Sequence, residues 1–278
     1  MEPQVLPILI KTWAGRQRHD FRYIRRSLPS LLASALPEGA RVVIVNDQST
    51  DPRLEPFLKQ LAAGDARVEL WTNPERMGPN RGQAYNFPRI LERFPNAKLF
   101  GLCDDDIVYH PGWLQRLVRV SEEAAEAGLS GIFSAINFPT RPCYASVQLP
   151  TSEVLLKERQ AAFNWLVPRD IYERVGPFRD AGVAFDTDYA NRMAPLGIPV
   201  ICLKPSFVQN IGYLGAYQSD NSHTARDYVG NVGWYLRAHS MAWTMRGYAA
   251  RLARGATRRV SRIARAYARP AERASGGE

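Results

Sequence analysis

Residues 98–106, KLFGLCDDD, hold the pattern that decides the fold, because an apolar run ends there in three consecutive aspartates. A short apolar run bounded by polar residues predicts a buried strand. A similar run, RVVIV at 41–45, is followed by Asn46 and Asp47, and further strand-like runs occupy 5–12 and 68–71. Stretches with helical apolar spacing alternate with these runs, at 21–35, 51–61, 83–94 and 113–127. The alternation predicts an α/β fold with βαβ units and a mostly parallel central sheet flanked by helices.

The second half of the chain is less regular. The pattern predicts a strand at 131–137, followed by a Pro-rich and polar loop with a short hairpin across 138–160. A short apolar run at 163–167 comes next. Helices are then predicted at 168–175 and 186–196, and a last strand at 199–203. No internal repeat and no Gly/Ser linker interrupts the sequence. The simplest division is one globular domain over residues 1–230 with an extension after it.

Composition narrows the class of protein. The 278 residues are 45% hydrophobic and 23% charged, which excludes a wholly disordered chain, a collagen and a coiled-coil rod. No apolar run has the roughly 18–20 residues that a membrane-spanning helix needs, and residues 5–10 lack the features of a signal peptide, so we expect a cytoplasmic protein. The three cysteines, Cys103, Cys143 and Cys202, lie far apart beside apolar neighbours and are predicted to be buried free thiols.

Most of the net charge lies at the C-terminus. The chain carries +9, and residues 241–278 supply +7 of it through nine arginines and two glutamates. Apolar residues recur there at spacings of four and three, from Met241 to Tyr267. We predict a basic amphipathic helical extension over 231–270 and a disordered tail over 271–278, with peripheral contact to the anionic inner face of the cell membrane. The alternative is that the apolar stripe packs on this domain or on a partner subunit. The tail carries no RNA-binding motif, and we expect no nucleic-acid partner.

Polar side chains follow the predicted strands at the edge where open α/β sheets bind ligands. Thr12 follows the first strand, Asp47 the second, and Asp104, Asp105 and Asp106 the fourth. Three adjacent carboxylates repel one another, and a hard divalent cation, Mg²⁺ or Mn²⁺, would offset that repulsion. The alternative is a solvated acidic turn that caps the following helix.

Three further features suggest a nucleotide and a base. The Asp47 carboxylate is placed to accept from the N–H of a nucleobase. The loop at 73–86 contains Gly78, Gly82 and Arg81 ahead of a helix, a composition that can cradle a phosphate, although it is neither GxGxxG nor a P-loop. Asp186, in FDTDY at 185–189, is either a plain helix cap or a general base for an acceptor hydroxyl.

In their order and spacing these features resemble family 2 glycosyltransferases, nucleotide-sugar enzymes with the Rossmann-like GT-A fold. The resemblance extends from about residue 5 to about residue 212. It is carried by five segments: VNDQSTD at 45–51, the loop at 78–86, the aspartate triplet, WLVPRDIYERVGPF at 165–178, and FDTDYANR at 185–192. Tyr85 stands where the family usually has Arg, and Phe185 where it usually has Glu.

The resemblance implies a role for each candidate residue. Asp106 is the main ligand of a Mn²⁺ or Mg²⁺ ion, with Asp104 and His223 completing the site, and Asp186 is the catalytic base of an inverting transfer. A register shifted by one residue would bring Asp105 into the metal site instead, and the alternative for His223 is a histidine in a surface loop. The remaining candidates bind a nucleoside diphosphate sugar, with UDP the default nucleotide: Thr12, Asp47, Gly78, Arg81, Asn86, Asp104 and Asp105. The expected acceptor is a hydroxyl on a glycan or a lipid-linked sugar.

Two other functions stay open at this stage. A sugar nucleotidyltransferase of the same fold needs a long Gly/Arg/Lys-rich loop after the first strand, and residues 13–18 contain one glycine. A non-catalytic carbohydrate- or nucleotide-binding relative is the second alternative. The aspartates at 47, 104, 106 and 186 argue against it.

The C-terminal arginines give a first test. Truncation after Ser240 should release the protein from anionic vesicles at low salt, because the apolar stripe and its arginines are removed together. Co-sedimentation with vesicles of anionic and of neutral lipid measures this. A full-length protein that ignores anionic vesicles, or a truncated one that unfolds, would assign the stripe to protein packing instead.

Overall fold

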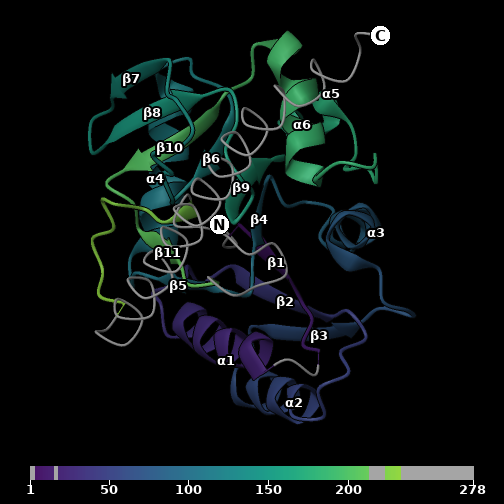
Figure 1. Ribbon diagram of the computed structural model, residues 1–278. Coiled ribbons are helices and arrows are strands. Elements are labelled where there is room, and N and C mark those ends of the chain that lie inside the picture. Colours follow the sequence, from purple (N-terminus) through teal and green to yellow (C-terminus); the bar gives the residue numbers. More distant parts are fainter. Residues whose placement is uncertain (1–3, 16–17, 213–222, 233–278) are drawn as a thin grey trace, which may run out of the picture. The chain divides into compact units, whose positions relative to one another are not determined.

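The computed structural model describes residues 4–15, 18–212 and 223–232 (Figure 1). These residues belong to a unit that ends at Val232. The amphipathic helix and the tail predicted from the sequence fall almost entirely at 233–278, outside the described residues. No helix among the described residues is both long and apolar enough to cross a membrane.

The first half of the chain alternates strands and helices as predicted. Its elements are β1 (Leu6–Thr12), α1 (Arg18–Leu32), β2 (Ala40–Asn46), α2 (Leu54–Gly64), β3 (Val68–Thr72), α3 (Gly78–Arg93), β4 (Leu99–Cys103), β5 (Ile107–Tyr109) and α4 (Trp113–Glu126). The second half continues with β6 (Ile132–Ser134), β7 (Ala145–Gln148), β8 (Glu153–Lys157), β9 (Asn164–Pro168), α5 (Arg169–Val175), α6 (Phe185–Met193), a 3₁₀ turn (Ala194–Leu196), β10 (Val200–Lys204) and β11 (Val208–Asn210).

One large sheet organises the described residues. Its nine strands lie in the order β3-β2-β1-β4-β9-β6-β10-β8-β7, and β11 pairs with β5 in a separate small sheet. Strands β3, β2, β1 and β4 are all parallel neighbours. β9 runs antiparallel to both β4 and β6, and β8 runs antiparallel to both β10 and β7. The predicted α/β fold with a mixed, mostly parallel sheet is therefore confirmed.

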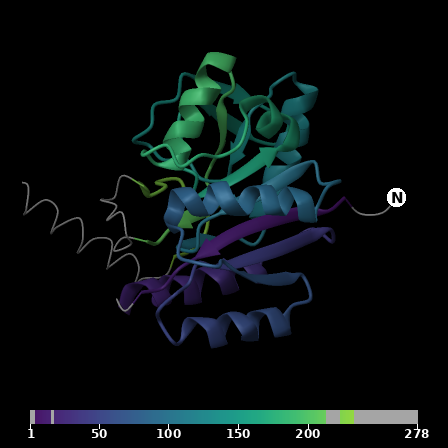
Figure 2. The same ribbon diagram turned by 90° about the vertical axis from the view of Figure 1, so that its right-hand side faces the viewer.

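Strict alternation along the strands builds a core on each face of the sheet. In β1, Ile8 and Ile10 face one core, while Leu9 between them faces the other. Helices α1, α2 and α4 contribute to the first core, and α3, α5 and α6 to the second (Figures 1 and 2). Side chains with a period of two thus bury both faces, as expected for the parallel part of an α/β sheet.

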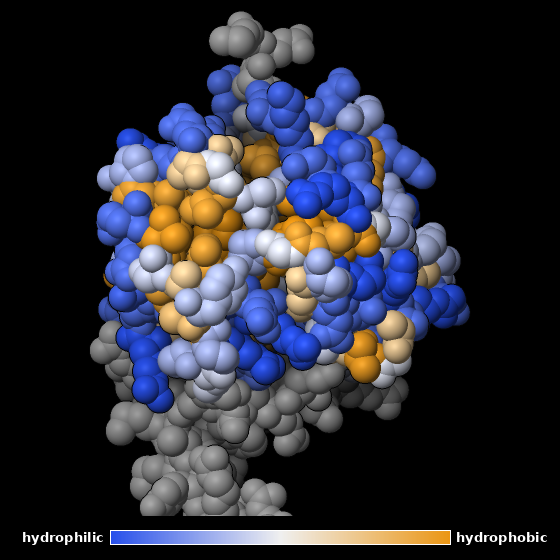
Figure 3. Space-filling model, turned by 90° about the horizontal axis from the view of Figure 1, so that it is seen from above, coloured by the Kyte–Doolittle hydropathy of each residue, from blue (hydrophilic) through white to orange (hydrophobic). Residues whose placement is uncertain are grey.

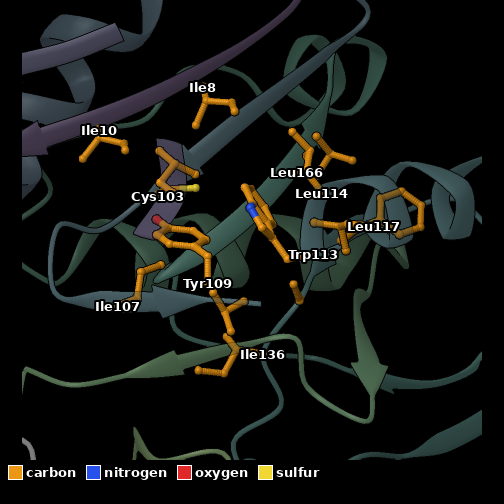
Figure 4. Close-up of a cluster of buried hydrophobic side chains, with 14 of the residues drawn as sticks. Ile8, Ile10, Cys103, Ile107, Tyr109, Trp113, Leu114, Leu117, Ile136 and Leu166 are labelled. Atoms are coloured by element: carbon orange, nitrogen blue, oxygen red, sulfur yellow. The ribbon is translucent and has the colours of Figure 1, made fainter. Parts of the chain in front are cut away.

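The first core continues up to the end of β4. Figure 4 shows Tyr109 and Trp113 packed beside Cys103, Ile8 and Ile10, with the Tyr109 hydroxyl on the Cys103 side. The Tyr109 and Trp113 rings lie 5.0 Å apart, and the Tyr109 hydroxyl donates to the backbone oxygen of Asp104 at 3.3 Å. The strand end that carries the aspartates therefore rests on the packed rings of Tyr109 and Trp113.

Several boundaries differ from those that the sequence predicts. α2 begins at Leu54 instead of Asp51, because the Asp51 carboxylate accepts the Arg53 N–H and pairs with the Arg53 guanidinium in a local turn. α3 begins at Gly78, five residues earlier than expected. The run at 163–167 is β9, inserted antiparallel between β4 and β6. The short strands β5 and β11 were not predicted, since three residues give no usable periodicity.

The prediction of three buried thiols is wrong at one position. Cys103 and Cys202 are buried, whereas Cys143 is exposed in the segment that leads into β7. Figure 3 shows apolar patches among hydrophilic residues on the face seen from above. Over the described residues, the large apolar side chains that are exposed are Tyr85, Tyr144, Val183, Leu196 and Val229.

Candidate active site

The parallel register brings the ends of β1, β2 and β4 to one edge of the sheet. Thr12, the last residue of β1, pairs with Asn46, the last residue of β2, and Ile10 of β1 pairs with Cys103 at the end of β4. Asp47 and the aspartate triplet follow directly from these strand ends. Their side chains therefore emerge at the carboxyl edge, where ligands bind in open α/β sheets.

Asp47 lies at the centre of this edge and is fully buried. Its Oδ1 accepts hydrogen bonds from Asn73 Nδ2 at 2.6 Å and from the Met77 N–H at 3.0 Å. Its Oδ2 accepts from the Gly78 N–H at 2.8 Å and lies 3.7 Å from Lys11 Nζ. A carboxylate at a helix N-terminus satisfies amides that the helix leaves unpaired. Asp47 thus fixes the start of α3, which explains why this helix begins early.

This arrangement changes the expected roles of two residues. Gly78, predicted to offer its backbone N–H to a phosphate, donates that N–H to Asp47 in this structure. Asp47, predicted to contact a nucleobase, already receives three hydrogen bonds and one ion pair from the protein. Buried polar atoms nearby lack a hydrogen-bond partner among the described residues: Trp13 Nε1, Asn73 Oδ1 and Gln83 Oε1. A nucleoside offers groups of the kind that would satisfy such atoms.

Lys11 is the residue at this edge that the sequence analysis missed. Its side chain is only 10% exposed, although it carries a charge at the end of an apolar strand. Its stem passes over Gly82 in α3, where an added Cβ would lie 2.6 Å from Lys11 Cδ and 2.8 Å from Cε. The signal was present in the sequence as one lysine within the run LPILIKT. Lys11 places a positive charge between Asp47 and the aspartate triplet.

The aspartate triplet concentrates negative charge at the end of β4. Burial raises the pKa of Asp104 well above its usual range, and the charges of Asp106 and Asp105 raise it further. Lys11 acts in the opposite direction on Asp104. The pKa of Asp105 is also raised by burial, with the Thr12 side chain and Lys11 opposing the rise. The charged form of Asp104 is therefore disfavoured unless further positive charge is supplied.

Asp106 is contacted on the other side by Ile211 and Gly212, the two residues that follow β11. The Ile211 N–H donates to the Asp106 backbone oxygen at 2.8 Å. A Cβ added at Gly212 would overlap the Asp106 carboxylate, so only glycine lets that side chain lie where it does. Sequence reasoning gave no reason to select Gly212, because the close approach involves residues over a hundred positions apart.

Asp186 lies at the N-terminus of α6 and faces the same region. Its Oδ2 accepts from the Ala162 N–H at 3.3 Å, and its Oδ1 accepts from the Thr187 N–H at 2.7 Å. Phe163, the residue after Ala162, accepts the Asp104 N–H at 2.9 Å through its backbone oxygen. The charge of Asp186 also raises the pKa of Asp104. The structure thus brings Asp186 and the triplet together, because each is hydrogen-bonded to one of the two residues before β9, Ala162 and Phe163.

Three other predicted residues lie in different surroundings. His223 packs edge-on against Phe138 and Phe163, with ring centroids 5.4 and 5.5 Å away. Arg81 is about half exposed and pairs with Glu75. Asn86 is fully buried within α3, where it donates to the Gly82 oxygen at 2.8 Å and accepts from Arg89.

The donor set suits a hard cation. In the described part of the chain, no three His, Cys, Asp or Glu side chains converge as a finished metal site. Mg²⁺ and Mn²⁺ commonly use one or two carboxylates together with substrate phosphates, so a finished protein cage is not required. The mutual repulsion in the triplet supplies the electrostatic reason for a cation to bind here, with Asp104 and Asp106 as its candidate ligands.

The contact between Lys11 and Gly82 gives a stability test. Gly82→Ala should destabilise the protein by about 1–3 kcal/mol, because its methyl group requires the Lys11 stem to move. In a Lys11→Ala background most of that cost should disappear. A double-mutant cycle measures this coupling free energy by urea unfolding of the wild type, the two single variants and the double variant. Gly64→Ala is the matched control, since a Cβ there meets nothing within 4 Å. Additive costs for Gly82→Ala and Lys11→Ala would contradict the contact.

Comparison with known proteins agrees with this architecture. The family model of glycosyl transferase family 2 matches residues 18–176. No curated protein sequence matches the chain.

Solved structures with the same fold include three transferase complexes. The mannosyltransferase PcManGT from Pyrobaculum calidifontis, in complex with GDP-Man and Mn²⁺, is 17% identical with a TM-score of 0.52, over 74% of this chain and 57% of that one. GalNAc-T7 with UDP, GalNAc and Mn²⁺ is 11% identical with a TM-score of 0.57, over 83% and 45%. Residues 1–349 of TarS from S. aureus, in complex with UDP-GlcNAc, are 14% identical with a TM-score of 0.52, over 74% of this chain and 58% of that one. The chain thus spans about half the length of these structures.

Proposed function

Because the chain belongs to glycosyl transferase family 2, we propose that it moves a sugar from a nucleoside diphosphate sugar to a hydroxyl acceptor with inversion at the anomeric carbon. One observation carries the proposal. The aspartate triplet after β4 and Asp186 of α6 are held against two consecutive residues: the Asp186 carboxylate accepts the Ala162 N–H at 3.3 Å, and the Phe163 backbone oxygen accepts the Asp104 N–H at 2.9 Å. A leaving-group site and a base on a separate element are the two parts that such a transfer needs.

On this proposal Asp186 is the general base. Its carboxylate takes the proton from the acceptor hydroxyl as that oxygen bonds to the anomeric carbon. The bond from this carbon to the diphosphate oxygen breaks on the opposite face, and the nucleoside diphosphate leaves with the electron pair. Attack opposite the leaving group inverts the configuration.

Charge control at the diphosphate is the second requirement. Asp106 and Asp104 would hold the divalent cation, Mn²⁺ or Mg²⁺, with His223 as a further candidate ligand. When bound, the cation supplies charge neutralisation for the departing diphosphate. The neighbours that hold Mn²⁺ with UDP or with GDP-Man support a cation of this kind, without deciding between Mn²⁺ and Mg²⁺.

The donor side is built from the ends of β1 and β2 and the start of α3. We propose that Thr12, Asp105 and Arg81 contact the nucleotide directly, and that Asp47, Gly78 and Asn86 act through the position of α3. UDP is the nucleotide we test first, and a glycan or lipid-linked sugar is the expected acceptor. On sequence grounds alone, the basic C-terminal residues would bring the enzyme to an anionic membrane surface.

A panel of donors tests the proposal. At least one nucleoside diphosphate or nucleotide sugar should raise the melting temperature in the presence of Mn²⁺, because a ligand that binds only the native state stabilises it. Asp106→Ala should lose the Mn²⁺-dependent part of this stabilisation. Failure of every nucleotide to stabilise the wild-type protein, at any Mn²⁺ concentration, would contradict the proposal.

The base is tested separately in the same assay. Asp186→Asn should keep the donor-dependent rise in melting temperature and lower turnover by about 10²-fold or more, the usual scale for loss of a general base. Asp180→Asn, an exposed change in the segment before α6, is the matched control. Collapse of donor binding with surviving turnover would instead identify Asp186 as a donor-side residue.

A further inference from the structure

One side-chain amide joins the donor side of the site to the segment that carries Asp186. Asn80, in the first turn of α3, donates from Nδ2 to the Val183 backbone oxygen at 2.8 Å. Its Oδ1 accepts the Phe185 N–H at 3.0 Å. The nitrogen and the oxygen of the Asn80 amide are therefore both hydrogen-bonded to the residues on either side of Ala184, just before Asp186.

The chain just before Phe185 has little other support, whereas the Phe185 ring itself packs edge-on against Trp165 and Phe178, with ring centroids 6.4 and 5.6 Å away. Residues 179–184 are all exposed, so burial of side chains does not fix their path. Phe185 is the first residue of α6, and its N–H has no partner within the helix. The residue before it, Ala184, has no side chain that can cap this end. Asn80 supplies the missing cap from a different helix.

Asn80 is itself anchored to the donor side. The turn in which it lies starts at Met77 and Gly78, whose N–H groups donate to Asp47. Beyond Phe185, the Asp186 carboxylate accepts the Ala162 N–H, and Phe163 accepts the N–H of Asp104. A continuous series of hydrogen bonds and chain links therefore leads from Asp47 through Asn80 and Asp186 to Asp104.

We propose that Asn80 is a positioning residue for the reaction: it fixes the start of α6 so that the Asp186 carboxylate stays at a set place relative to the donor site. The inference rests on the proposed function. Asn80 touches neither reacting atom in this arrangement, and its effect passes through the backbone of 183–185. A small displacement of a catalytic group can cost up to about 10²-fold in rate, so loss of this amide should be seen in turnover.

Hydrogen exchange tests the link without any assay of activity. In Asn80→Ala, the amides of Phe185 and of Ala162 should both exchange faster than in the wild type, since the first loses its acceptor and the second loses a fixed Asp186. Glu92→Gln, an exposed change at the far end of α3, is the control and should leave both amides unchanged. An exchange rate that rises at Phe185 but stays the same at Ala162 would overturn the proposal, as would unchanged rates at both amides.

Kinetics separate positioning from a general structural role. Asn80→Ala should lower kcat about tenfold or more while the donor KM stays within about twofold. Asn80→Asp keeps an acceptor for the Phe185 N–H and should recover part of the loss. In an Asp186→Asn background, Asn80→Ala should cost little further, because there is no base left to misplace. A raised donor KM with unchanged kcat, or a full additional loss in that background, would overturn the proposal.

The two experiments also separate this inference from the function on which it rests. A wild-type protein that transfers no sugar from any donor overturns the proposed reaction and the kinetic role of Asn80 with it. Unchanged exchange at Phe185 and Ala162 in an active enzyme overturns the role of Asn80 alone.

Discussion

Mutual repulsion among the carboxylates at the end of β4 is the constraint on which the rest of this site depends. Asp104 is pushed toward its neutral form by burial, by Asp106 and Asp105, and from across the site by Asp186. The positive charge of Lys11 opposes this repulsion within the described part of the chain. Carboxylates with unfavourable interactions persist in native proteins chiefly where function needs them, because they cost stability.

The surrounding structure holds these charges in place by close backbone approaches. Gly82 makes room for the Lys11 stem, and Gly212 makes room for the Asp106 carboxylate. Asp47 ties α3 to the end of β2, and Asn80 ties α3 to the start of α6. The donor side and the proposed base therefore share one framework, although they come from opposite halves of the sheet. Apolar packing in the second core joins α3 to α6 through Phe178, and the hydrogen bonds of Asn80 add a directional link at the start of α6.

Local patterns in the sequence were enough for the parallel half of the sheet. Apolar runs such as RVVIV alternate with helical spacing, and each run buries both faces. The insertion of β9 between β4 and β6 could not be predicted, because pairing between strands so far apart leaves no local signal. The candidate site was predictable to the same extent. The candidate aspartates could be found as sequence motifs, whereas the hydrogen bonds that the Asp47 carboxylate accepts and the position of Lys11 depend on tertiary contacts. Cys143 was misjudged because its apolar neighbours belong to an exposed segment.

Stability as a function of pH, with and without a cation, tests the central claim most directly. When the pKa of a carboxyl is raised in the native state, the protein loses stability as the pH rises above 3.8, the ordinary pKa of that carboxyl in the unfolded chain. Asp104→Asn removes this loss, so the variant should be more stable than the wild type at neutral pH without divalent cation, and the advantage should shrink as the pH falls toward 4. Mn²⁺ with UDP should stabilise the wild type more than the variant. A wild type that is at least as stable as Asp104→Asn at neutral pH without cation, or equal stabilisation of both proteins by Mn²⁺ and UDP, would contradict the account.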